Sequence, residues 1–385
     1  MGASAVRAAG FAYPFLSYRL SELHFPARGV SGVLAAFGVG WLVGQLVCGR
    51  LAATLGRRTT LVSALLVSAA VLPLLAQATA PVAVGAAAVI AGMCYDAPRP
   101  VISAFVADEI TDEATRARIT GWRHFGINVG AATTGAVGGL LADSAGLSAL
   151  FWINAVACAV FAVVVLAVLP GDRPAPGPVD LAAGPVRDGR LWLLWLASVL
   201  GFVPVAGVFN ILPLLMEHSG LPASAYGWTQ VASAATVLLL SVPATDWLAR
   251  RPGSSSMVGL LAASSLVLGT GIGCAGLASS TLQYAAAAAA AVPGEITAIV
   301  AAQAVVDRIT PPQARGLYAG VWGTSLATAV ICAPVLAGFS LAQGGPGLVA
   351  VTTFSCGALG AVTCLPLAVL VNRHRTRPLS PTTPR

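Results

Sequence analysis

Residues 281–306 read TLQYAAAAAAAVPGEITAIVAAQAVV, an apolar stretch with one charged side chain, Glu295, near its middle. A helix needs about 20 apolar residues to cross a bilayer, and this stretch has enough. A carboxylate at that depth costs on the order of 2.5–3.5 kcal/mol unless it faces a cavity or a partner. The stretch therefore predicts a membrane-spanning helix that carries a functional carboxylate.

A second apolar stretch, residues 82–107, also encloses a carboxylate, Asp96. An offset of 199 residues separates Asp96 from Glu295, and the same offset aligns residues 108–111 (DEIT) with 307–310 (DRIT). It also aligns two other pairs, Pro14 with Pro213 and Gly139 with Gly338. The sequence therefore predicts an all-α membrane protein built from two related halves.

Composition excludes most soluble classes, because 57% of the residues are hydrophobic, 9% are charged and the mean hydropathy is +0.84. All 21 basic residues are arginines. They cluster in alternate short loops, which indicates membrane orientation rather than nucleic-acid binding. The seven cysteines lie in apolar stretches without a CxxC pair, and no Walker, metal-ligand or Ser/His/Asp pattern occurs. We expect neither an enzyme nor a cofactor or metal beyond a proton gradient.

Twelve apolar stretches are bounded by charges or by Pro/Gly turns. They predict two six-helix halves, residues 1–169 and 191–371, joined by a cytoplasmic linker at 170–190 and followed by a cytoplasmic tail at 372–385. With an even number of spans and the arginines on one side, both termini are expected in the cytoplasm. The stretches are 4–18, 30–53, 59–78, 82–107, 119–142, 147–169, 191–216, 225–249, 256–277, 281–306, 315–342 and 347–371.

The first stretch is short for a span. Only 13 residues precede Pro14, whereas residues 191–212 precede Pro213 within its stretch. We expect that the assigned Met1 lies too late and that the genomic sequence upstream encodes about ten more apolar residues.

The turn between the second and third stretches reads Gly49-Arg-Leu-Ala-Ala-Thr-Leu-Gly56-Arg57-Arg58. It resembles the signature Gly-x-x-x-Asp-Arg-x-Gly-Arg-Arg of the major facilitator superfamily, and the resemblance covers essentially the whole chain. The acidic position is Ala53 here. The second half has Asp246 and Arg250 at the matching turn. The resemblance implies that these residues help to latch one conformation, while the alternative is that the arginines only mark topology. The proposed latch comprises Gly49, Gly56, Arg57, Arg58, Asp246 and Arg250.

The resemblance extends to the drug–proton antiporter branch through two further segments. In the fourth stretch, Tyr95-Asp96-Ala-Pro98-Arg99-Pro100 is similar to that branch's acidic, proline and arginine pattern. Asp96 and Arg99 are one helical turn apart, so they form either a site or a mutually neutralising pair. The fifth stretch has the glycine spacing of the antiporter signature, and small residues there allow close helix packing. The packing positions are Gly130, Gly135, Gly138 and Gly139, with Pro334 in the other half.

Polar and aromatic residues predict the lining of a substrate cavity at the midplane. His124 is weighed as a titratable neighbour, although a histidine at a helix end is most often solvated. Single members of the set are equally compatible with packing or an interfacial belt. The set is Arg99, Arg123, Asn128, Tyr13, Asn210, Gln230, Gln303, Tyr318 and Trp322.

The two carboxylates are expected to couple transport to protons. Glu295 has no arginine nearby in sequence, so a low-dielectric surrounding favours its protonated form, whereas Arg99 keeps Asp96 ionised. The alternative for Glu295 is a hydrogen-bonded structural side chain. We interpret the chain as a monomeric transporter of the bacterial plasma membrane that exports a small organic compound or drug against proton entry. Its partners are the substrate, protons and lipid, without nucleic acid. The alternatives are proton-coupled import of a metabolite and a non-transporting scaffold or sensor.

Overall fold

A computed structural model describes residues 10–95, 113–169, 171–172, 188–249, 254–311 and 314–373. For some helical residues, among them 113–125, 127–128 and 244–249, it describes the backbone alone. The described part is α-helical apart from its short turns, and seven of its helices are long and apolar enough to cross a membrane.

The helices follow the predicted apolar stretches closely, since each ends at a charge, a glycine or a proline turn. The helix α13 consists of two helical stretches that meet at Gly345, whose φ is +66°. The elements are α2 (Ala12–Glu22), α3 (Ala27–Thr54), α4 (Arg57–Gln77), α5 (Pro81–Tyr95), α7 (Glu113–Ala145), α8 (Leu147–Val168), α9 (Gly189–His218), α10 (Ala223–Ala249), α11 (Ser254–Cys274), η2 (Ala275–Leu277), α12 (Thr281–Ile309) and α13 (Arg315–Arg373).

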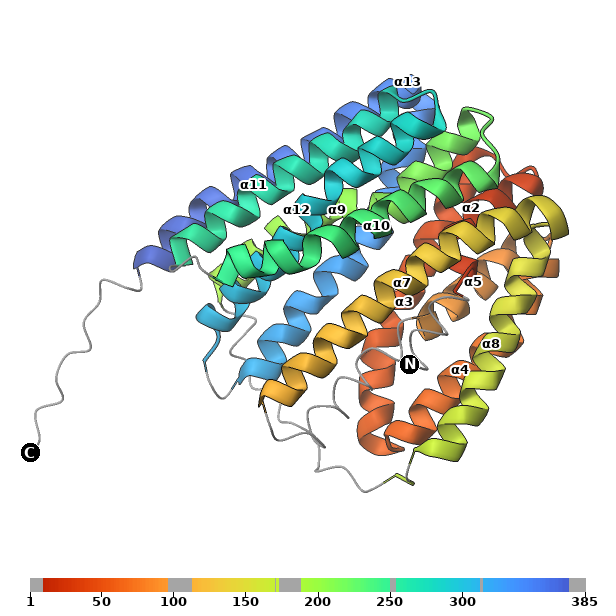
Figure 1. The fold of residues 1–385 in the computed structure, drawn as a ribbon, viewed down its shortest axis with the longest axis horizontal. Coiled ribbons are helices and arrows are strands. Elements are labelled where there is room, and N and C mark those ends of the chain that lie inside the picture. The colour runs from red at the N-terminus through yellow and green to blue at the C-terminus, as the bar shows by residue number, and fades with distance from the viewer. Residues whose placement is uncertain are drawn as a thin grey trace, which may run out of the picture.

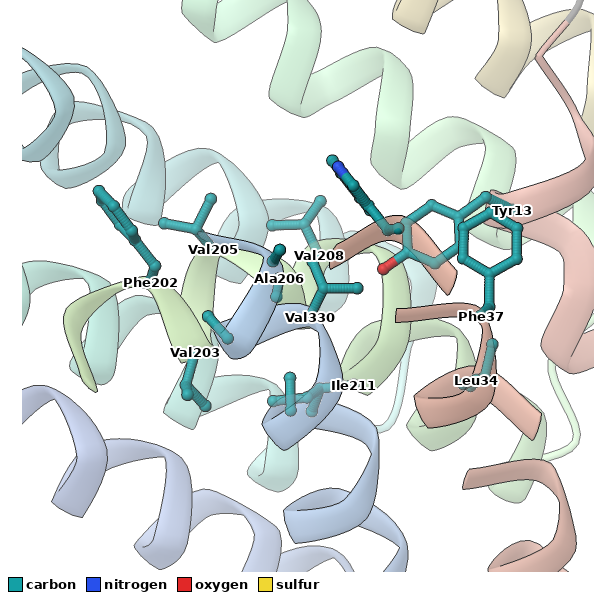
Figure 2. Close-up of a cluster of buried hydrophobic side chains, with 14 of the residues drawn as sticks. Tyr13, Leu34, Phe37, Phe202, Val203, Val205, Ala206, Val208, Ile211 and Val330 are labelled. Atoms are coloured by element: carbon teal, nitrogen blue, oxygen red, sulfur yellow. The ribbon is translucent and has the colours of Figure 1, made fainter. Parts of the chain in front are cut away.

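Helix pairing follows one pattern before and after residue 188. In the first part α3 packs on α5 and α4 packs on α5 and α8. In the second part α10 packs on α12 and α11 packs on α12 and α13. Among the described helices, α7 with α10, α3 with α13 and α2 with α9 make the main contacts between the two parts. Figure 2 shows the buried core across this boundary, where Tyr13 and Phe37 lie near Val208 and Val330.

The helices converge at one end of the bundle and diverge at the other. Figure 1 shows α11 and α13 running toward the left of the view while α4 and α8 run down its right side, away from the end where α2 lies. We name the end with Thr54, Arg57 and Gly189 the linker end and the end with Glu22 and Ala145 the distal end.

Glycine contacts between α3 and α13 agree with this divergence. Near the distal end, a Cβ at Gly338 would collide with the Ser31 side chain, and a Cβ at Gly38 would lie 2.9 Å from the Ile331 side chain. Toward the linker end, a Cβ at Gly49 or Gly320 would meet no atom within 4 Å. Gly38 and Gly338 therefore mark a tight contact of α3 with α13 toward the distal end, and Gly49 and Gly320 make no such contact.

Candidate functional site

Glu295 lies on the buried stripe of α12. Residues spaced three and four apart share one face of a helix, and this face carries Tyr284, Ala291, Ala298 and Ala302, each at most 2% exposed. Glu295 is partly exposed although its neighbours along the stripe are sealed. The packing around the stripe is therefore interrupted at the carboxylate.

Two apolar grooves show how this position relates to the first part of the chain. One groove, of about 430 Å³, lies between α4 and α5, and another, of about 660 Å³, lies between α11 and α12. Each position that lines the first groove has a counterpart 200 residues later that lines the second groove. Val71 corresponds to Gly271, and Ile90 corresponds to Ala290. The second groove is larger because smaller side chains replace larger ones.

In this segment the repeat thus has an offset of 200 rather than 199. The burial pattern agrees, because residues 82–92 and 282–292 alternate between buried and exposed in the same order. Tyr95 is then the counterpart of Glu295.

Tyr95 belongs to an aromatic cluster centred on Tyr13. The Tyr13 ring centroid lies 4.7 Å from that of Phe37, 5.3 Å from Tyr95, 5.8 Å from Phe209 and 6.1 Å from Trp41. These rings come from α2, α3, α5 and α9, so the cluster bridges the two parts of the chain. Because the two parts repeat, Tyr95 and Glu295 face corresponding regions of the first and second parts of the chain.

Asn210 joins this cluster from α9. Its amide nitrogen donates to the Tyr13 hydroxyl at 2.8 Å and to the Ala206 carbonyl at 2.9 Å. Its side chain is fully buried, and its carbonyl oxygen has no hydrogen-bond partner among the described residues. A buried polar atom without a partner costs about 1–3 kcal/mol. Tyr13 and Asn210 therefore lie together at a junction that a polar group could complete.

The two predicted glutamines lie in different surroundings. Gln230 is buried on α10 and donates to the Tyr226 hydroxyl at 2.8 Å and to the Val208 carbonyl at 3.1 Å. With Thr134 it lines a cavity of about 10 Å³, about enough for one water. Gln303 donates to Asp307 at 2.9 Å, one turn along α12. Gln303 is thus held toward the linker end, away from the aromatic cluster.

Tyr318 and Trp322 tie α13 to α9. The Tyr318 hydroxyl donates to Asp188 at 3.0 Å, and the Trp322 indole donates to Ser198 at 3.0 Å. A third bond of the same kind runs from Trp195 to Thr324 at 2.9 Å. The main polar groups of Tyr318 and Trp322 are therefore engaged in holding two helices of the second part together, a role that sequence reasoning missed.

Asp188 and Asp172 were also missed, and both bind at helix starts. Asp188 caps α9 and pairs with Arg190 at 2.8 Å. Burial raises the pKa of the Asp188 carboxyl, but hydrogen bonds from Arg190 and Tyr318 outweigh burial and lower that pKa below its ordinary value. The linker composition gave no signal for either contact, because both depend on the path of the chain.

Asp172 binds the turn between α3 and α4, which carries the signature residues Gly56, Arg57 and Arg58. It accepts hydrogen bonds from the backbone amides of Arg58 at 2.7 Å and Thr59 at 2.9 Å. Gly56 has a φ of +94°, and a Cβ there would collide with Asp172. The Arg58 guanidinium also donates to the Leu166 carbonyl in α8. These contacts of Arg58 stay within the first part of the chain.

The glycines of α7 make its close crossing with α10. A Cβ at Gly135 would lie 2.5 Å from the Gln230 Cβ, and one at Gly139 would lie 2.8 Å from the Ser224 Cα. In return, a Cβ at Gly227 would lie 2.3 Å from the Gly135 carbonyl oxygen. Gly138 faces Phe15 of α2 instead. Gly130 in α7 and Pro334 in α13 are buried as well.

Several predicted residues lie outside what the structure describes. These are Asp96, Arg99 and Arg250 as a whole, together with the side chains of Arg123, His124, Asn128 and Asp246.

The family model described as Major Facilitator Superfamily matches residues 2–294 and 194–385. The chain belongs to the Major Facilitator Superfamily. It is therefore a multi-pass membrane transporter of the secondary type and not an enzyme. A comparison with curated proteins gave no match.

Solved structures of transporters share this member's fold. A mutant of the nucleoside transporter NupG superposes with a TM-score of 0.74 at 14% identity, covering 97% of this chain and 98% of that one. A POT family transporter in complex with 5-aminolevulinic acid gives 0.76 at 13% identity, with 97% and 95% covered. A mutant peptide transporter POT in complex with alafosfalin gives 0.77 at 16% identity, with 97% and 93% covered. At these identities the likeness establishes the fold alone.

Proposed function

We propose that the protein exports a small organic compound or drug against proton entry by alternating access, with Glu295 as the proton carrier. The observation that carries the proposal is the exposure of Glu295 on a stripe of α12 that is otherwise sealed. An ionisable side chain held in an apolar helix is costly, and an opening beside it is what proton binding and release require.

The architecture supports alternating access between two six-helix halves. The pairing of α3 with α5 and α4 with α8 recurs as α10 with α12 and α11 with α13. The described part of the chain has eleven α-helices, and counting α13 as two spans around Gly345 gives the twelve spans of the proposal. Transporters with parallel repeats bind substrate at the midplane between their halves. The proposed substrate site is therefore the aromatic cluster around Tyr13 with Asn210.

Orientation follows from the arginines. Arg57, Arg58 and Arg190 lie at the linker end, so the proposal places that end in the cytoplasm and the distal end outside. The divergence of α3 from α13 toward the linker end then corresponds to an inward-facing conformation.

Replacement of Glu295 tests the coupling. A compound panel is first screened for substrate-triggered proton movement in proteoliposomes, and an identified substrate is then followed with and without a pH gradient. Glu295→Gln should abolish accumulation against a gradient and spare downhill exchange, because the amide mimics the protonated acid. Asp96→Asn should weaken both, since it leaves Arg99 unpaired in the membrane.

Asp307→Asn is the matched control, because Asp307 is exposed on the same helix. It should transport like the wild type. Uphill transport by Glu295→Gln with an unchanged pH dependence would show that Glu295 is structural. Export is separated from the alternative, proton-coupled import, by comparing accumulation in intact cells with that in everted vesicles.

A further inference from the structure

A second partly exposed carboxylate lies where α2 meets α9 at the distal end. Glu217 is the penultimate residue of α9, and Ser21 of α2 lies beside its carboxylate. Its oxygen Oε2 is buried and has no hydrogen-bond partner among the described residues. The Tyr18 hydroxyl, also from α2, is buried and equally without a partner. Two polar side chains thus meet there with incomplete hydrogen bonding.

The groups around Glu217 offer no compensating charge. Arg19 donates to Glu22 and to the Ala76 carbonyl, both at 2.6 Å, so its guanidinium is engaged elsewhere. His218 follows Glu217 but is exposed. No described cation lies within ion-pair distance of Glu217.

The remaining ionisable neighbours are acids or phenols. Tyr18 is influenced electrostatically by Glu217, by Tyr284 of α12 and by Asp143 of α7. Its ring packs on that of Tyr226 in α10 at 6.0 Å. The hydroxyls of Tyr284 and Ser219 form a hydrogen bond of 3.1 Å. Acids and phenols from α7, α9, α10 and α12 therefore lie around Tyr18 of α2, where the two halves meet.

We call the contact between α2 and α9 around Tyr18, Ser21 and Glu217 the seam. Closure of this seam depends on the charge of Glu217. When the seam is closed, an ionised carboxylate has one buried oxygen that no donor satisfies, which is unfavourable. A protonated carboxyl can donate its hydrogen to the neighbouring Tyr18 hydroxyl, which has no other partner. Opening would expose both groups to water, which solvates the ionised form.

We propose that Glu217, with Tyr18 and Ser21, is a second proton-binding site, and that its protonation closes the distal end of the transporter. The proposal rests on the alternating access proposed above and adds a site distinct from Glu295. A proton taken from the distal side would favour the closed seam, and its loss would favour opening. The closed population should therefore rise as the pH falls.

Hydrogen–deuterium exchange of the full chain in lipid nanodiscs tests the site without substrate or gradient. Uptake is measured from pH 5 to pH 9 in peptides that cover residues 12–22 and 214–226, corrected for intrinsic exchange rates. In the wild type, uptake should increase with pH, with a change of about tenfold in the opening equilibrium. Glu217→Gln should keep low uptake at every pH, because the amide cannot ionise.

Two further variants make the result specific. Glu22→Gln alters an exposed carboxylate at the same end and should keep the wild-type pH dependence. Ser21→Ala removes a donor to the ionised form and should shift opening to lower pH. The proposal is overturned if Glu217→Gln retains the wild-type pH dependence, or if Ser21→Ala leaves the midpoint unchanged. Because no transport is measured, this result is independent of the coupling test on Glu295.

Discussion

Substitution of Gly227 by alanine tests the close crossing of α7 and α10. A Cβ at Gly227 would lie 2.3 Å from the Gly135 carbonyl oxygen, whereas ordinary van der Waals contact begins near 3.4 Å. The two helices must therefore separate by about 1 Å near the distal end. Overpacking of this kind costs about 1–3 kcal/mol. If only the distally closed conformation bears this cost, its population relative to the open one should fall by about 5- to 150-fold, since 1.4 kcal/mol is tenfold.

Electron–electron double resonance, which measures the distance between two spin labels, would report this change. Labels at Ser144 and Pro222, both exposed at the distal end, follow the separation of α7 from α10 after the exposed Cys274 is replaced by serine. Gly259→Ala is the control, because a Cβ there meets no atom within 4 Å and makes the same change in helix propensity. Gly227→Ala should populate a longer distance that Gly259→Ala lacks. Identical distance distributions in the two variants would refute the packing argument.

Two other predictions concern the linker end and the orientation. Asp172→Ala should lower the free energy of unfolding at pH 7 by about 1 kcal/mol, because the backbone amides at the start of α4 lose the Asp172 carboxylate as their hydrogen-bond acceptor. Burial raises the pKa of the Asp172 carboxyl, but hydrogen bonds from Thr59 and Arg58 lower that pKa overall. The stabilisation by Asp172 is therefore present above the ordinary carboxyl pKa of about 4, and it is lost as the pH falls through the lowered pKa. Melting curves of variant and wild type should therefore converge as the pH falls below the ordinary carboxyl pKa, and a gap that does not narrow with falling pH would contradict this explanation. Ala145→Cys and Gln343→Cys, both at exposed positions, should react with impermeant thiol reagents from outside the cell, and reaction only from the cytoplasm would reverse the orientation.

The helices were predictable because hydropathy and charge reflect the cost of burying polar groups in a bilayer. Charged turns at Arg57 and Arg190 therefore bound the spans within a few residues of where the structure has them. The contacts of Asp172 and Asp188 were not predictable, since they depend on how the linker folds back on the bundle. Neither was the engagement of Tyr318 and Trp322 with α9, because helical periodicity does not say which neighbour a face meets.

The repeat illustrates the same limit. The sequence offset of 199 residues was taken from Asp96 and Glu295 and from residues 108–111 with 307–310, but α4–α5 and α11–α12 correspond at 200. A shift of one residue leaves the apolar composition unchanged, so hydropathy cannot detect it. It changes which side chain faces the interior, and it makes Tyr95 the counterpart of Glu295. Glu217 escaped attention because it lies at a helix end, where a carboxylate is ordinarily solvated.

The three hydrogen bonds between α9 and α13 have a mechanical consequence. Asp188, Trp195 and Ser198 engage α13 over the first turns of α9, and farther along the helix Asn210 bonds with Tyr13 of α2. A displacement applied at the linker end of α9 would therefore be shared with α13, and we expect it to reach α2 through Asn210 and Tyr13.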